Sequence, residues 1–125
     1  MNVVDSSAWL EYFADGPNAD FFADAVEETE ALVVPTLSLY EVFKRILQQR
    51  SEDEALAAIT VMLQARVTNL TATLAISAAR LSGKSGLPQA DSVMLATARA
   101  HDAVLWTQDA DFEGMAGVRY QPAAG

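Results

Sequence analysis

The chain has 125 residues, a net charge of −9 and no cysteine. This length suits a single domain, here residues 1–125, and a hydrophobic content of 51% is sufficient for one compact core. The absence of cysteine excludes disulfides, cysteine-ligated zinc and thiol catalysis. No apolar stretch reaches the roughly 20 residues that span a bilayer, and the first residues lack the features of a signal peptide. We therefore expect a cytoplasmic protein.

The acidic composition limits how the chain can bind nucleic acid. Proteins that coat nucleic acid through general electrostatics are typically basic. Any nucleic-acid contact here therefore needs a local source of attraction, either a bound divalent cation or a group of Lys and Arg side chains.

Short apolar or β-branched runs alternate with segments of helical periodicity, a pattern typical of a parallel sheet covered by helices. Strands are predicted at residues 2–5, 31–35, 66–70, 103–107 and 117–120. The helices between them should bury, in chain order, Trp9, Tyr12 and Phe13; Phe21, Phe22 and Val26; Leu39, Phe43, Ile46 and Leu47; Leu56, Ile59 and Leu63; and Leu74, Ala78 and Leu81. Ser51 and Thr71 are predicted N-caps, and residues 89–101 form a largely buried last helix. The pattern indicates one doubly wound α/β unit.

Two aspartates follow predicted strands. Asp5 closes the first strand and Asp109 follows the fourth, and ligands of open parallel sheets bind outside the carboxyl ends of the strands. Either side chain could instead cap a helix or turn, and for Asp5 the two roles are compatible because each carboxylate oxygen has two lone pairs.

Two more carboxylates come from predicted helices. Asp91 falls in the same helical row as Met94, Leu95 and Ala98, where an ionised carboxylate needs donors or a cation. Glu41 lies in the first turn after the second strand, although Ser38 and Glu41 also match a capping box, and Glu41 could pair with Arg45. Four carboxylates gathered at one sheet edge would repel each other unless protonated or bound to cations. Magnesium, which prefers oxygen ligands, would suit phosphodiester hydrolysis there, with one ion or two.

The sequence resembles the PIN-domain family, and within it the VapC-type toxins of toxin–antitoxin pairs. The resemblance rests on the order and spacing of residues 3–8, 38–42, 89–98 and 106–112, and it covers nearly the whole chain. It implies a PIN-like three-layer α/β/α fold with a central, mainly parallel sheet of four or five strands.

The resemblance also implies an activity and a set of site residues. The family's members cut RNA with magnesium or manganese. Asp5, Glu41, Asp91 and Asp109 match its acidic positions: the three aspartates would hold the metal and Glu41 would orient a water beside it. Supporting roles would fall to Ser7, Thr107 and Asp111. Toxins of this kind usually form homodimers and are inhibited by an antitoxin whose extended tail occupies a groove beside the site. The antitoxin then carries the complex to promoter DNA.

Docking of RNA to so acidic a chain needs basic side chains. The candidates are Lys44, Arg45, Arg80, Lys84 and Arg99, each of which could equally belong to a solvated helix face.

Three alternatives remain to be weighed. A non-catalytic PIN-like binding module would keep the fold without binding metal, which the complete set of acidic residues disfavours. A phosphoacceptor receiver domain needs an acceptor Asp after a middle strand and a late Lys, but the third strand ends in Asn69 and Leu70 and no Lys follows Lys84. A haloacid-dehalogenase-like phosphatase needs a second Asp just after Asp5, where Ser7 stands instead.

Overall fold

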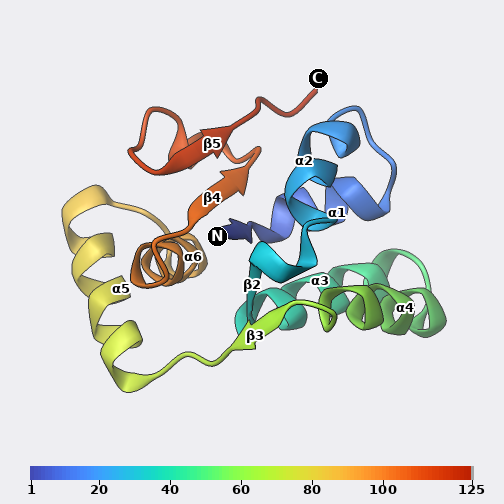
Figure 1. Ribbon diagram of the computed structural model, residues 1–125, viewed down its shortest axis with the longest axis horizontal. Coiled ribbons are helices and arrows are strands. Elements are labelled where there is room, and N and C mark those ends of the chain that lie inside the picture. Colours follow the sequence, from blue (N-terminus) through green and yellow to red (C-terminus); the bar gives the residue numbers. More distant parts are fainter. Residues whose placement is uncertain (125) are drawn as a thin grey trace.

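One parallel sheet forms the centre of the molecule in the computed structural model, which describes residues 1–124 (Figure 1). The strand order is β3-β2-β1-β4-β5, and every neighbouring pair is parallel. The strands are β1 (Asn2–Val4), β2 (Leu32–Pro35), β3 (Arg66–Thr68), β4 (Val104–Thr107) and β5 (Val118–Tyr120). All five predicted strands are present. Because β1 is the central strand, the residue that follows it, Asp5, lies in the middle of the carboxyl edge of the sheet.

Helices cover both faces of the sheet, as the predicted three-layer fold requires. They are α1 (Ser6–Phe13), α2 (Ala19–Val26), α3 (Thr36–Gln49), α4 (Glu52–Met62), α5 (Ala72–Ser85) and α6 (Gln89–Ala100), with short 3-10 helices η1 (Thr29–Ala31) and η2 (Ala110–Phe112). Figure 1 shows α1 to α4 on one side of the sheet and α5 and α6 on the other. The helix α6 packs directly on β1, β2 and β4, whereas α5 packs mainly on α6.

Two buried cores lie on the two faces of the sheet. Successive strand residues point to opposite faces, so Val4 belongs to the core under α1 to α4, whereas Val3 belongs to the core under α6. Trp9 is the largest fully buried side chain of the first core, and Met94 and Phe112 are fully buried in the second. Burial of a side chain of this size stabilises the fold by about 1.5–3 kcal/mol.

The prediction of which leucines are buried in α3 and α4 was wrong at three positions. Leu47, Leu56 and Leu63 are exposed, and Ile59 is only partly buried. The residues that α4 buries are Ala55, Ala58 and Met62. The helix lies flat against α3 with its small residues inward, so its buried stripe is rotated by one residue from the row of leucines.

Two of the three predicted helix N-caps are present in the structure. Ser51 and Thr71 do accept hydrogen bonds from the backbone N–H groups of Glu54 and Leu74, at 3.1 and 3.2 Å. The capping box at Ser38 is wrong, because α3 begins two residues earlier and the buried Ser38 hydroxyl is directed at the sulfur of Met94. Among the described residues, no helix is both long and apolar enough to cross a membrane.

Candidate metal centre

Asp5 is a buried carboxylate at the centre of the sheet edge, with only 4% of its surface exposed. One oxygen, Oδ1, accepts a hydrogen bond of 2.9 Å from the backbone N–H of Ser6 and so caps α1. The other, Oδ2, accepts hydrogen bonds from the hydroxyls of Ser7 (3.1 Å) and Thr107 (2.9 Å). The cap role and the site position therefore coexist, and the two predicted supporting residues, Ser7 and Thr107, both contact Asp5.

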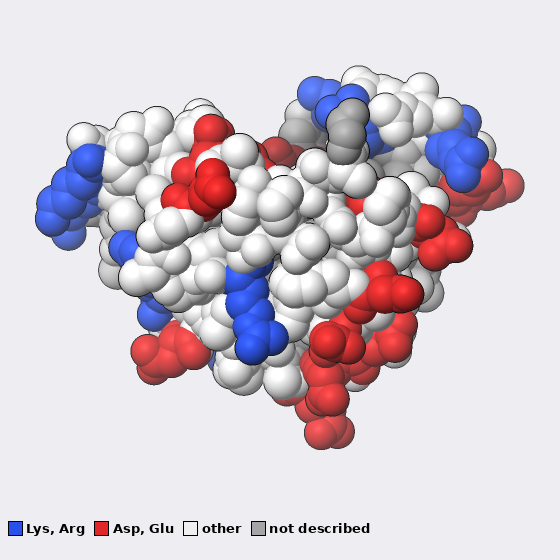
Figure 2. Space-filling view, turned by 90° about the horizontal axis from the view of Figure 1, so that it is seen from above, with Lys and Arg blue, Asp and Glu red and all other residues white. Residues whose placement is uncertain are grey.

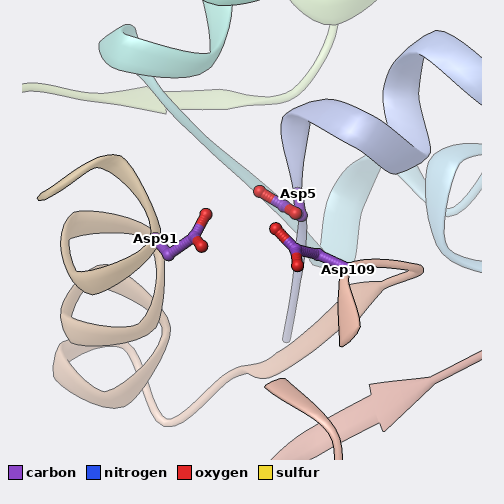
Figure 3. Close-up of side chains that lie close together, drawn as sticks. All are labelled: Asp5, Asp91 and Asp109. Atoms are coloured by element: carbon purple, nitrogen blue, oxygen red, sulfur yellow. The ribbon is translucent and has the colours of Figure 1, made fainter. Parts of the chain in front are cut away.

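Asp91 and Asp109 approach Asp5 from two other elements. Asp91 projects from the first turn of α6, and Asp109 follows β4. Figure 3 shows the three carboxylates directed toward a common point. One carboxylate oxygen from each residue lies within 4.8 Å of the other two. The predicted convergence of these three side chains is thus present in the fold.

Thr107 connects two of the three aspartates. Its hydroxyl oxygen accepts a hydrogen bond of 3.0 Å from the backbone N–H of Asp109 while donating to Asp5. The side chain of Asp109 in turn accepts from the N–H of Asp111, at 2.9 Å, and caps η2. This chain of hydrogen bonds fixes the turn after β4 relative to the end of β1.

The electrostatics of the cluster oppose its ionisation. Burial raises the pKa of Asp5 from 3.8 to about 6, although its three hydrogen-bond donors act in the opposite direction. The pKa of Asp91 is raised to about 7, mainly by burial and then by the charges of Asp5, Asp109 and Asp111. Near neutral pH the three aspartates therefore carry negative charge that no side chain of the cluster neutralises, and a bound cation would neutralise it.

The donor set and its spacing fit a divalent cation with a preference for oxygen. Each oxygen ligand of magnesium lies roughly 2.0–2.1 Å from the ion, so neighbouring ligands are about 3 Å apart. The oxygens of Asp5, Asp91 and Asp109 lie within 4.8 Å of each other, so the three side chains would have to draw closer together around a shared ion. Thr107 and Ser7 hold Asp5 in place for such an ion, as hydrogen-bonded carboxylates do around many metals.

Glu41 lies at the same cavity but outside the group of three aspartates. Its Oε1 accepts a hydrogen bond of 2.7 Å from the hydroxyl of Ser6, the residue that follows Asp5. Ser6, in the first turn of α1, thus binds both carboxylates: its backbone N–H donates to Asp5 and its hydroxyl donates to Glu41. Sequence reasoning missed this role of Ser6, because no local pattern links it to a residue 35 positions away.

A cavity of about 450 Å³ opens over the carboxylates. The two basic residues predicted to contact RNA at the site, Lys44 and Arg45, both line it, as do the unpredicted Tyr40 and Gln48. The other predicted cations, Arg80, Lys84 and Arg99, line a separate groove between α5 and α6. Asp111 is exposed and is not among the lining residues; it acts on Asp91 through its charge.

The surface charge is unevenly distributed. Figure 2 shows acidic side chains gathered at the lower right of that face, with basic side chains mostly toward the edges. Exposed acidic residues of this chain include Asp20 and Asp24 of α2 and the following Glu27, Glu28 and Glu30. The acidic surface would therefore repel a nucleic acid, so attraction at the cavity would depend on Lys44 and Arg45.

The fold, together with an acidic cluster at the carboxyl edge of the sheet, corresponds to a known class of protein. The sequence model of the PIN domain matches residues 3–118, and the chain belongs to this family. None of the curated proteins matches it.

Solved structures share the fold over almost the full chain. A toxin–antitoxin complex from Klebsiella pneumoniae has a TM-score of 0.79 at 20% identity, covering 95% of this chain and 96% of that one. VapC20 of Mycobacterium tuberculosis, a toxin that cleaves the sarcin-ricin loop, has a TM-score of 0.76 at 18% identity, covering 93% and 95%. PAE2754 of Pyrobaculum aerophilum has a TM-score of 0.74 at 23% identity, covering 96% and 88%.

Proposed function

We propose that the chain is a magnesium- or manganese-dependent endoribonuclease that hydrolyses RNA phosphodiester bonds. The observation that carries the proposal is the convergence of Asp5, Asp91 and Asp109 at the carboxyl edge of the sheet of a PIN domain. Nucleases of this family typically use divalent metals, and the oxygen-only donor set is of the kind that magnesium and manganese prefer.

Each residue at the cavity has a part in this chemistry. Asp5, Asp91 and Asp109 would hold the metal, which when bound polarises the phosphodiester and stabilises the negative charge that develops on it. Glu41, which accepts a hydrogen bond from Ser6, would orient the attacking water and take its proton as the water oxygen bonds to phosphorus. The bond from phosphorus to the leaving oxygen would break in the same displacement, and that oxygen would take up a proton from solvent. Lys44 and Arg45 would hold the RNA phosphates against the repulsion of the carboxylates.

We further propose that the nuclease is the toxin of a type II toxin–antitoxin pair and acts in the cytoplasm, because several proteins of the same fold are VapBC complexes. A groove of about 710 Å³ between α1, α3 and α4 offers an apolar surface for an extended antitoxin segment. Leu10 lines both this groove and the carboxylate cavity, so a basic antitoxin residue could pass from one to the other. A homodimer, bound to promoter DNA only through the antitoxin, completes the proposal.

The proposal is tested by incubating the purified chain with total RNA, with magnesium and with chelator, and mapping new 5′ ends. We expect discrete cleavage sites that require the metal and disappear in Asp91→Asn. Cleavage that persists in chelator would overturn the metal mechanism. Absence of both cleavage and metal binding by the folded chain would instead favour a non-catalytic binding module.

A further inference from the structure

Tyr40 is an exposed aromatic ring at the rim of the carboxylate cavity. Its exposed fraction of 61% is the highest among the large hydrophobic side chains of the described residues. Tyr12, by contrast, packs against the first core and donates its hydroxyl to Glu27. Tyr40 makes no such contribution to the core, although a ring of this size would stabilise the fold if it were buried.

The surroundings of Tyr40 are those of a nucleic-acid contact. Tyr40, Lys44 and Gln48 follow one another at four-residue intervals along α3, so they form one row on the wall of the cavity. The Lys44 ammonium lies 5.7 Å from the centre of the Tyr40 ring. Glu41 and Arg45 form the adjacent row. An aromatic ring, two cations and an amide therefore line the same 450 Å³ cavity as the three aspartates.

This combination favours a nucleobase over an apolar protein segment as the occupant. Proteins bind single-stranded RNA through aromatic rings on which bases stack, next to cations that contact the phosphates. An apolar segment would leave Lys44, Arg45 and the carboxylates without partners. A base in a duplex is stacked between its neighbours and could not reach the ring, so the occupant has to be an unpaired base.

We propose that Tyr40 is the platform on which an unpaired base of the RNA stacks beside the aspartate cluster, with Lys44 and Arg45 contacting the adjacent phosphates. This inference rests on the proposed ribonuclease function and adds to it a residue that positions the RNA beside the metal site. Gln48, one turn farther along, is placed to hydrogen-bond to a base edge.

The test reads stacking directly, separately from cleavage. A short single-stranded RNA carrying 2-aminopurine, whose fluorescence is quenched when the base stacks, is titrated with the chain in the Asp91→Asn background, so that the RNA is not consumed. We expect quenching on binding, retained by Tyr40→Phe. Tyr40→Leu and Tyr40→Ala should lose the quenching and bind about 5- to 150-fold more weakly. Ile76→Ala, which removes an exposed side chain of α5, is the matched control and should bind normally.

The outcomes separate this inference from the proposed function. Quenching and affinity that are equal in Tyr40→Leu and Tyr40→Phe would overturn the inference, even if the native chain cleaves RNA. Binding with Tyr40-dependent quenching, but without metal-dependent cleavage by the native chain, would support the stacking platform and overturn the nuclease. If Tyr40→Ala converts a dimer to a monomer and leaves the quenching unchanged, the ring serves contact between copies and the inference falls.

Discussion

Asp5→Asn is expected to stabilise the metal-free chain at alkaline pH, and this gain should shrink as the pH falls. Burial is the main reason why the pKa of Asp5 is raised to about 6 from 3.8. For a carboxyl whose folded pKa is raised, the stabilisation is complete below the unfolded pKa and is lost as the pH rises through the folded pKa. An amide does not ionise, so the variant does not suffer that loss.

The expected magnitude follows from the two pKa values. A shift from 3.8 to about 6 corresponds to about 3 kcal/mol at pH 8. At pH 5 the unfolded carboxyl is ionised while the folded one is mostly protonated, and the same linkage gives about half of that value. The amide also replaces one acceptor oxygen by a donor, which costs about 1 kcal/mol at either pH because Ser6, Ser7 and Thr107 all donate to Asp5. The net gain in free energy of unfolding is therefore about 2 kcal/mol at pH 8 and only a small fraction of that at pH 5.

Urea unfolding in chelator at the two pH values measures this difference. Asp24→Asn, on the exposed part of α2, is the matched control and should change the free energy of unfolding by less than about 0.5 kcal/mol at both. The reasoning would be refuted if the effect of Asp5→Asn were the same at both pH values or grew toward acid.

Three further outcomes are expected. Magnesium at ten times its Kd should stabilise the native chain by about 1.4 kcal/mol, which raises Tm by about 5 °C. Calorimetry should find no such shift in Asp91→Asn. An equal shift in the native chain and in Asp91→Asn would mean that the ion binds elsewhere. Glu41→Gln should slow single-turnover RNA cleavage by about 10²-fold or more while keeping the magnesium-induced Tm shift. Ser6→Ala, which removes the hydrogen bond to Glu41, should slow cleavage less in the same assay. Unchanged rates would show that Glu41 has no part in the mechanism. Arg45→Gln should weaken RNA binding and reduce its salt dependence by about one phosphate contact, as measured by a salt titration. Arg99→Gln, in the separate groove between α5 and α6, should change neither. An equal loss of affinity in the two variants would mean that RNA contacts both surfaces.

The gathering of the aspartates could be predicted because it depends on topology alone. Strands of a parallel sheet end at one edge, so residues one or two positions beyond β1 and β4 lie close together once those strands pair. Asp91 could be placed because its helical row is otherwise apolar and faces the sheet. Alternation of strand and helix patterns brought these carboxylates toward one edge of the sheet, and the resemblance to the PIN-domain family selected them as the site.

Details that depend on side-chain packing could not be predicted in this way. The hydrogen bond from Ser6 to Glu41 joins residues 35 positions apart, and no local pattern marks it. The rotation of α4, which exposes Leu56, is set by how closely its alanines approach α3. Likewise, α3 begins two residues before the apparent capping box, and the Ser38 hydroxyl contacts Met94, 56 positions away, rather than the end of its own helix.

The most direct test of the central claim is the single-turnover rate of RNA cleavage as a function of magnesium concentration, for the native chain, Asp5→Asn, Asp91→Asn and the control Asp24→Asn. The metal-dependent mechanism predicts a rate that rises with magnesium to saturation in the native chain and the control. In the two site variants, which should remain folded, the rate should fall by about 10²-fold or more. A full rate in chelator, or an undiminished rate in both site variants, would contradict it.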